Sequence, residues 1–142
     1  MDKGLVAKAS VSIHAPIVKV WDALIEPEMI RQYMFGTEVV SDWKEGSPIV
    51  WKGVWEGTPY EDKGVILKLK PEQILQYTHV IPIAGPPDTR EDHHTVTFEL
   101  TRQGEETLLS ISQDNNRTET EREHSEKMWK TMLNGLNLLL KE

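Results

Sequence analysis

The chain has 142 residues, with 16 basic and 23 acidic side chains that give a formal net charge of −7, and it contains no cysteine. This length suits one domain, which we expect to span residues 1–142, and the acidic balance argues against a nucleic-acid partner. The lack of cysteine excludes disulfides and thiol chemistry. The chain shows no signal-like segment and no apolar run long enough for a membrane span, so we predict a cytoplasmic protein.

The first part of the chain predicts one strand and two short helices. Apolar and polar residues alternate over Leu5–Ile13, which is typical of a half-buried strand. A first helix is expected to begin near Pro16, since proline suits the first turn of a helix. A second begins near Pro27 and ends before Gly36.

The central part of the chain predicts an antiparallel meander. From Thr37 to Gln113 the apolar period is two, and turn residues separate the segments by short connections. The expected strands are Thr37–Val40, Ser47–Trp55, Tyr60–Lys70, Gln73–Val80, His93–Thr101 and Thr107–Gln113.

The last part of the chain predicts a long amphipathic helix. Thr118-Glu119-Thr120-Glu121 is a capping box, and the apolar stripe after it continues to about Lys141. The order of elements predicts an α+β fold, a curved antiparallel sheet wrapped around the C-terminal helix, with two short helices after the first strand.

Sequence motifs for metal, phosphate or nucleophilic chemistry are absent. The chain has no glycine-rich phosphate loop, no G-x-S-x-G elbow and no H-E-x-x-H helix. His93 and His94 are adjacent, but on a strand they point to opposite faces and cannot readily share an ion. We therefore predict no metal site, no cofactor and no catalytic residue that a motif identifies.

Alternation along the expected strands indicates which side chains face the space between sheet and last helix. On Tyr60–Lys70 it directs Val65, Leu67 and Leu69 inwards. Elsewhere it gathers aromatic, histidine and methionine side chains, a mixture that suits a small-molecule cavity because it combines apolar area with a few orienting hydrogen bonds. The predicted ligand-binding residues are Trp51, Trp55, Tyr77, His79, His94, Phe98, Met128 and Met132.

Two groups within this prediction leave alternatives open. His79 and His94 are expected to meet across a hairpin around residues 85–87, either anchoring a ligand carbonyl or carboxylate or bonding to structural partners. Among the five tryptophans, Trp51 and Trp55 are candidates for a cavity wall or for simple packing. The tryptophans on helical stripes, Trp21 and Trp129, are expected to anchor the core, and Trp43 to lie at a rim.

Several phrases of the sequence together carry a family resemblance. They include the early P-x-x-x-V-W run Pro16–Trp21, the segment Leu108–Asn115, and the terminal W-x-x-M-L-x-G-L run Trp129–Leu136. In these the chain resembles the START-related helix-grip superfamily SRPBCC, and within it the branch named after the activator of heat-shock protein 90 ATPase. The resemblance covers essentially the whole chain. It implies a sheet that grips a C-terminal helix, with a hydrophobic cavity between them that binds lipids, sterols, polyketides or hormones in other members.

The function predicted from the sequence is binding of a small hydrophobic or amphipathic ligand between the sheet and the C-terminal helix, by a monomer or weak homodimer. One alternative is a cyclase or hydrolase that uses a cavity histidine as general acid or base. Another is a chaperone-linked interaction module, which predicts an exposed apolar patch. We favour a binding protein over an enzyme.

Overall fold

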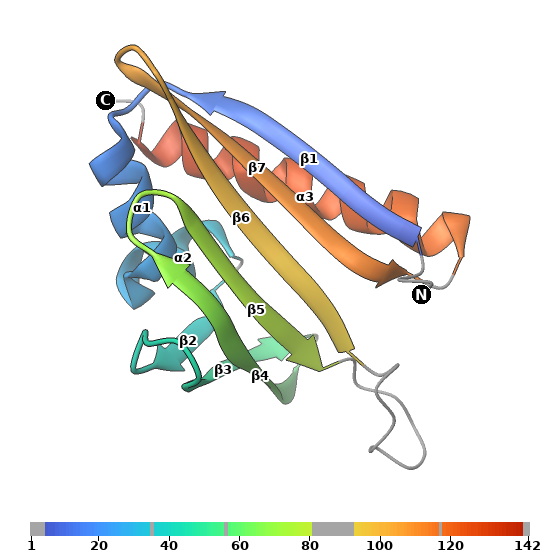
Figure 1. The fold of residues 1–142 in the computed structure, drawn as a ribbon. Helices are drawn as coiled ribbons and strands as arrows, with labels where there is room; N and C mark the ends of the chain where they lie inside the picture. Colours follow the sequence, from blue (N-terminus) through green and yellow to red (C-terminus); the bar gives the residue numbers. More distant parts are fainter. Residues whose placement is uncertain (1–4, 35, 56, 81–92, 117, 141–142) are drawn as a thin grey trace.

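The computed structural model describes residues 5–34, 36–55, 57–80, 93–116 and 118–140. Its strands form a seven-stranded antiparallel sheet in the order β1-β7-β6-β5-β4-β3-β2 (Figure 1). The first strand therefore pairs with the last, and the others follow one another as a meander. The elements are β1 Leu5–Ile13, α1 Ile17–Ile25, α2 Pro27–Tyr33, β2 Glu38–Ser41, β3 Pro48–Trp55, β4 Thr58–Lys70, β5 Ile74–Val80, β6 His93–Gln103, β7 Glu106–Asn116 and α3 Glu119–Leu140.

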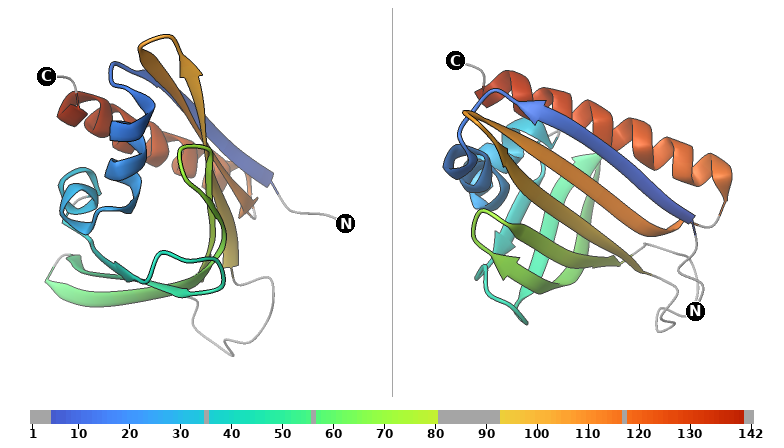
Figure 2. Two further views of the ribbon diagram at one scale, coloured as in Figure 1. Left: turned by 60° about the vertical axis from the view of Figure 1, so that its left-hand side comes forward. Right: turned by 45° about the horizontal axis from the view of Figure 1, so that its top comes forward.

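The three helices lie on the concave side of the curved sheet (Figure 2), which confirms the predicted α+β helix-grip arrangement. Helix α3 covers the part of the sheet formed by β1 and β7, and α1 and α2 lie beside it. The apolar core fills the space between the sheet and the helices. Trp21 and Trp129, each 5% exposed, anchor α1 and α3 in this core as predicted.

Helix α3 also protects the free edge of β1. The Lys8 N–H donates to the Glu126 carboxylate at 3.1 Å, and the His14 N–H donates to the Asn137 side-chain oxygen at 3.3 Å. Arg122 holds Glu126 from one turn earlier, at 2.7 Å. These contacts occupy backbone donors that an open sheet edge would offer to another chain.

The start of α3 is fixed by a cap and by a buried polar chain. The Glu121 N–H donates to the Thr118 hydroxyl at 3.1 Å, as the capping box predicts. The indole N–H of Trp129 donates to Gln113 at 2.7 Å, and Gln113 donates in turn to Ser125 at 3.3 Å. A buried polar network in which each member has a partner fixes the position of the helix on β7.

The prediction for the inward face of β4 is wrong at two positions. Val65 and Leu67 are 42% and 43% exposed, whereas Ile66 is fully buried. The cause is a register shift between Ile66 and Lys68, which are paired with the adjacent residues Tyr77 and Gln76 of β5. An extra residue reverses the facing of a strand. Only beyond this point does Leu69 pack inwards, as expected.

Candidate functional site

Three aromatic rings form one wall of the site on the inner face of the sheet. Trp51 of β3 lies with its ring centroid 5.0 Å from that of Tyr77 in β5, and Tyr77 lies 5.8 Å from Phe98 in β6. Trp51 reaches across β4 because Gly64 there has no side chain: a Cβ on Gly64 would lie 3.3 Å from the Trp51 ring. The glycine at position 64 therefore allows the Trp51 ring to contact Tyr77, so that the aromatic wall is continuous across β4.

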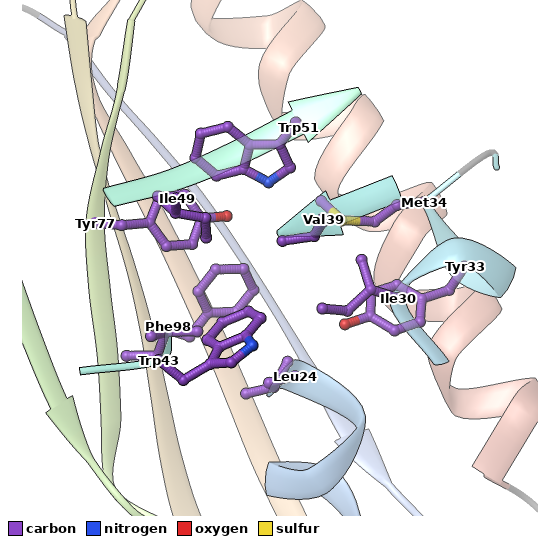
Figure 3. Close-up of a pocket in the computed structure, with 11 residues that line it drawn as sticks. Leu24, Ile30, Tyr33, Met34, Val39, Trp43, Ile49, Trp51, Tyr77 and Phe98 are labelled. Carbon is purple, nitrogen blue, oxygen red and sulfur yellow. The ribbon is translucent and has the colours of Figure 1, made fainter. Parts of the chain in front are cut away.

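The opposite wall comes from the two short helices and the edge of the sheet. Leu24 of α1, Ile30 and Tyr33 of α2, and Val39 of β2 face the aromatic rings (Figure 3). Together the walls enclose a cavity of about 10 Å³, roughly the space of one water-sized group. The residues that line it are Leu24, Ile30, Tyr33, Met34, Val39, Trp43, Ile49, Trp51, Leu75, Tyr77 and Phe98.

Met34 and Trp43 mark the side on which this pocket approaches the surface. Both are partly exposed, whereas the other lining residues are buried. Trp43 has a positive φ of 56°, and its N–H donates to the Ser41 hydroxyl at 3.0 Å. The side-chain hydroxyl of Ser41 thus holds the strained turn that carries Trp43, which lies at the rim, as the sequence suggests.

Two histidines continue the wall beyond Trp51. His79 and His94 are directly paired between β5 and β6, so the predicted meeting of the two is confirmed. Their rings stack with centroids 6.5 Å apart, and the His79 ring lies 4.9 Å from that of Trp51. Each histidine has a fixed partner: His79 Nε2 lies 3.2 Å from Asp62 Oδ2, and His94 Nδ1 lies 2.7 Å from the Asp114 carbonyl oxygen.

The electrostatics of His79 are set mainly by burial, which lowers its pKa below the ordinary value; the Asp62 carboxylate offsets part of this effect, and His94 adds to it. Its side chain is 28% exposed and that of Asp62 is 22% exposed. A partly buried imidazole that is paired with a carboxylate can accept a proton or a hydrogen bond. Among the described residues, no group of three or more His, Cys, Asp or Glu side chains could hold a metal ion.

The structure brings together only part of the predicted site. Trp51, Tyr77 and Phe98 line the pocket, and His79 and His94 adjoin it. The side chain of Trp55 lies outside the described residues. Met132 is buried in the core, but it is not among the described residues that line the pocket.

Met128 was predicted to face the cavity, and this is wrong. It is 40% exposed and lies at the edge of the buried stripe of α3. The stripe is narrower than expected because α3 packs mainly along β1, at the edge of the sheet. The pocket itself lies against α1 and α2 rather than α3, because Trp129 packs edge-on against Phe98 at 5.9 Å and fills the intervening space.

Sequence reasoning missed several pocket residues and one partner. Tyr33 and Met34 come from α2 and its C-terminal end, which carried no sign of a site beyond apolar spacing. Asp62 was missed because its position beside His79 depends on the pairing of β4 with β3 and β5. The directly opposed pair Trp51 and Asp62 shows that both side chains lie on one face. Asp62 could have been identified as a partner of His79 only if the register of β4 had been known.

Comparison with known families agrees with this fold. Residues 14–141 match the family described as activator of Hsp90 ATPase homolog 1-like protein. The chain belongs to this family. Comparison with curated protein sequences gives no match.

Several solved structures are similar to this family member. The protein ChR145 from Cytophaga hutchinsonii is 53% identical, with a TM-score of 0.86 over 99% of this chain and 97% of that chain. The Aha1 dimer from Colwellia psychrerythraea is 18% identical, with a TM-score of 0.76 over 96% of each chain. CalU16 from Micromonospora echinospora is 19% identical, with a TM-score of 0.71 over 96% of this chain and 83% of that chain. The last two show the fold alone.

A second hollow on this family member lies at the surface. It is a groove of about 310 Å³ between α2 and β2, lined by residues 27, 28, 31 and 38–41. Arg31 and Glu28 in the groove are already paired with each other at 2.7 Å, and both are well exposed. A groove with charged side chains among its lining residues suits an apolar ligand less well than a pocket whose described lining residues carry no charge. Among the described residues, no helix is both long and apolar enough to cross a membrane.

Proposed function

We propose that the protein binds a small, largely apolar molecule in the pocket between the inner face of β3, β5 and β6 and the helices α1 and α2. The observation that carries this proposal is the lining itself. None of the described residues that line the pocket is charged, and four of them are aromatic with a polar end. Such a surface supplies apolar area together with a small number of directional groups.

Binding requires the pocket to widen. A cavity of about 10 Å³ holds one water-sized group, so a larger ligand has to displace a wall. The side where Met34 and Trp43 are partly exposed is the place for this movement, since two side chains there can turn towards solvent without uncovering the core. The aromatic wall on the sheet stays fixed because its strands are paired on both sides.

Titration with naphthalene, an uncharged apolar probe, tests the proposal by NMR. We expect saturable shifts of the Trp51 and Tyr77 signals. Val39→Phe fills the pocket and should abolish them, whereas Val40→Phe should not, because Val39 is 2% exposed and the neighbouring Val40 is 50% exposed. Wild-type signals of the pocket residues that never respond to naphthalene would contradict the proposal, even if Val39→Phe fails to fold.

One observation favours a second function, a hydrolase that uses His79 as a general base. His79 lies 3.2 Å from Asp62 Oδ2 and directly beside the pocket residue Trp51. Hydrolysis of 4-nitrophenyl acetate should then fall sharply in His79→Gln and not in His124→Gln, which changes an exposed histidine on α3. Equal rates in the two variants would remove this alternative.

A further inference from the structure

The polar ends of the aromatic residues in the pocket wall differ in whether they are used by the protein itself. The Tyr33 hydroxyl donates to the Ala23 carbonyl oxygen at 2.7 Å. The Tyr77 hydroxyl and the Trp51 indole N–H make no hydrogen bond within the part of the chain that the structure describes. Both residues are 5% exposed, so little of either side chain reaches the solvent.

These two groups border the open space of the pocket. Among the described residues, no buried side-chain nitrogen or oxygen that is sealed from open space lacks a partner. The unpaired Tyr77 oxygen and Trp51 nitrogen are therefore not sealed in the packing. Figure 3 shows both directed into the space between the sheet and α2. Buried Tyr and Trp side chains usually find a partner for their polar ends, so the pocket is prepared for a group that supplies one.

The chemistry of that group follows from what the two side chains can do. An indole N–H only donates a hydrogen bond. Burial raises the pKa of Tyr77 above its ordinary value, so its hydroxyl stays protonated and can donate as well. The two rings are in contact, with centroids 5.0 Å apart. A carbonyl oxygen, which has two lone pairs, can accept from both donors at once.

Charge decides between a neutral carbonyl and a carboxylate. None of the described residues that line the pocket carries a positive charge. A buried carboxylate without a counter-charge is strongly unfavourable, whereas a neutral carbonyl that receives two hydrogen bonds is not. We propose that the pocket selects uncharged carbonyl compounds with an apolar body, whose carbonyl oxygen accepts hydrogen bonds from Tyr77 and Trp51. This inference rests on the proposed binding function.

Three probes of nearly the same shape test the selection: 2-acetylnaphthalene, its alkene isostere 2-isopropenylnaphthalene, and 2-naphthoate. We expect calorimetry to show the ketone binding about tenfold more tightly than the alkene, which corresponds to the net value of one or two hydrogen bonds. The carboxylate should bind most weakly. In Tyr77→Phe the ratio of ketone to alkene affinity should fall towards one but stay above it, because only the Trp51 N–H remains as a donor.

Tyr33→Phe is the matched control, because its hydroxyl is already bonded within the protein. It should change the affinities of ketone and alkene by the same factor. NMR of the wild type gives an independent readout: the Trp51 indole proton should shift downfield with the ketone and not with the alkene.

The outcomes separate the two proposals. If none of the three probes binds, the proposed function itself fails. If ketone and alkene bind equally well, or if the carboxylate binds best, the pocket still binds apolar molecules but the selection for a carbonyl is wrong. An unchanged Trp51 indole proton in the ketone complex contradicts the selection as well.

Discussion

Replacing Gly64 with alanine is expected to destabilise the protein because β4 has no space for a Cβ atom at this position. A Cβ there would lie 1.7 Å from the Thr78 carbonyl oxygen and 2.7 Å from its carbonyl carbon. Real Cβ contacts are essentially never below 3.0 Å, so β4 and β5 must separate by roughly 1 Å or more. The obstacle is backbone, and the nearby bond of 2.9 Å from the Val65 N–H to the Thr78 hydroxyl must distort with it.

This geometry allows an estimate of how much Gly64→Ala lowers the free energy of unfolding. Overpacking usually costs about 1–3 kcal/mol, and we expect about 3 kcal/mol here because backbone rather than a side chain has to move. For a domain of this size that lowers Tm by roughly 10 °C. The Trp51 ring, which lies over Gly64, should move too, so naphthalene binding should weaken in the same variant.

Urea denaturation followed by circular dichroism measures the effect, and Gly135→Ala in α3 is its control. A Cβ on Gly135 would lie 3.9 Å from Tyr33 Cβ, which is ordinary contact. Alanine in a helix should therefore stabilise the protein by about 0.5–1 kcal/mol. If Gly64→Ala proves as stable as the wild type to within about 0.5 kcal/mol, the close approach of β4 to β5 is refuted.

Further predictions concern titration, the buried polar chain and assembly. Because burial lowers the pKa of His79 below 6.5, the unfolded chain binds the proton more readily, so this contribution to stability is present above pH 6.5 and is lost on acidification towards the lowered pKa; His79→Gln should flatten this dependence in urea denaturation. Asp62→Asn should lower the pKa of His79 further in an NMR titration, since the carboxylate raises it. Trp129→Phe leaves the Gln113 oxygen without its donor and should cost about 1–3 kcal/mol in the same denaturation assay. Sedimentation velocity should show a monomer or a weakly associating dimer, and a stable larger assembly would contradict this.

The sequence predicts the inner face of β5 and β6 correctly because both strands are regular. Tyr77 and His79 alternate in step with the buried positions of their neighbours, and so do His94 and Phe98. Their pairing across the hairpin follows from a register without irregularities. Strict alternation is therefore enough to bring these four side chains to one wall.

The same reasoning fails on β4, because alternation cannot reveal a bulge. Lys68 and Lys70 are both exposed, and extending their phase backwards puts Leu67 and Val65 inside. The irregular pairing between Ile66 and Lys68 reverses that phase. No residue type near the bulge indicates its presence in the sequence. The tertiary structure is therefore needed to assign the inward face of β4.

The helical residues that line the pocket could not be predicted from the sequence, for a different reason. The spacing of apolar residues predicts that α2 buries Ile30 and Tyr33, but not which part of the sheet they meet. The structure places α2 against β2 and the pocket, and leaves α3 against β1. Which helix closes a cavity depends on packing between elements distant in the sequence.

A crystal structure of the protein with 2-acetylnaphthalene tests the central claim most directly. We predict the naphthalene ring between the aromatic wall and α2, with the carbonyl oxygen within hydrogen-bond distance of Tyr77 Oη and Trp51 Nε1. A ligand seated in the groove between α2 and β2, with the pocket closed as it is here, would contradict the account.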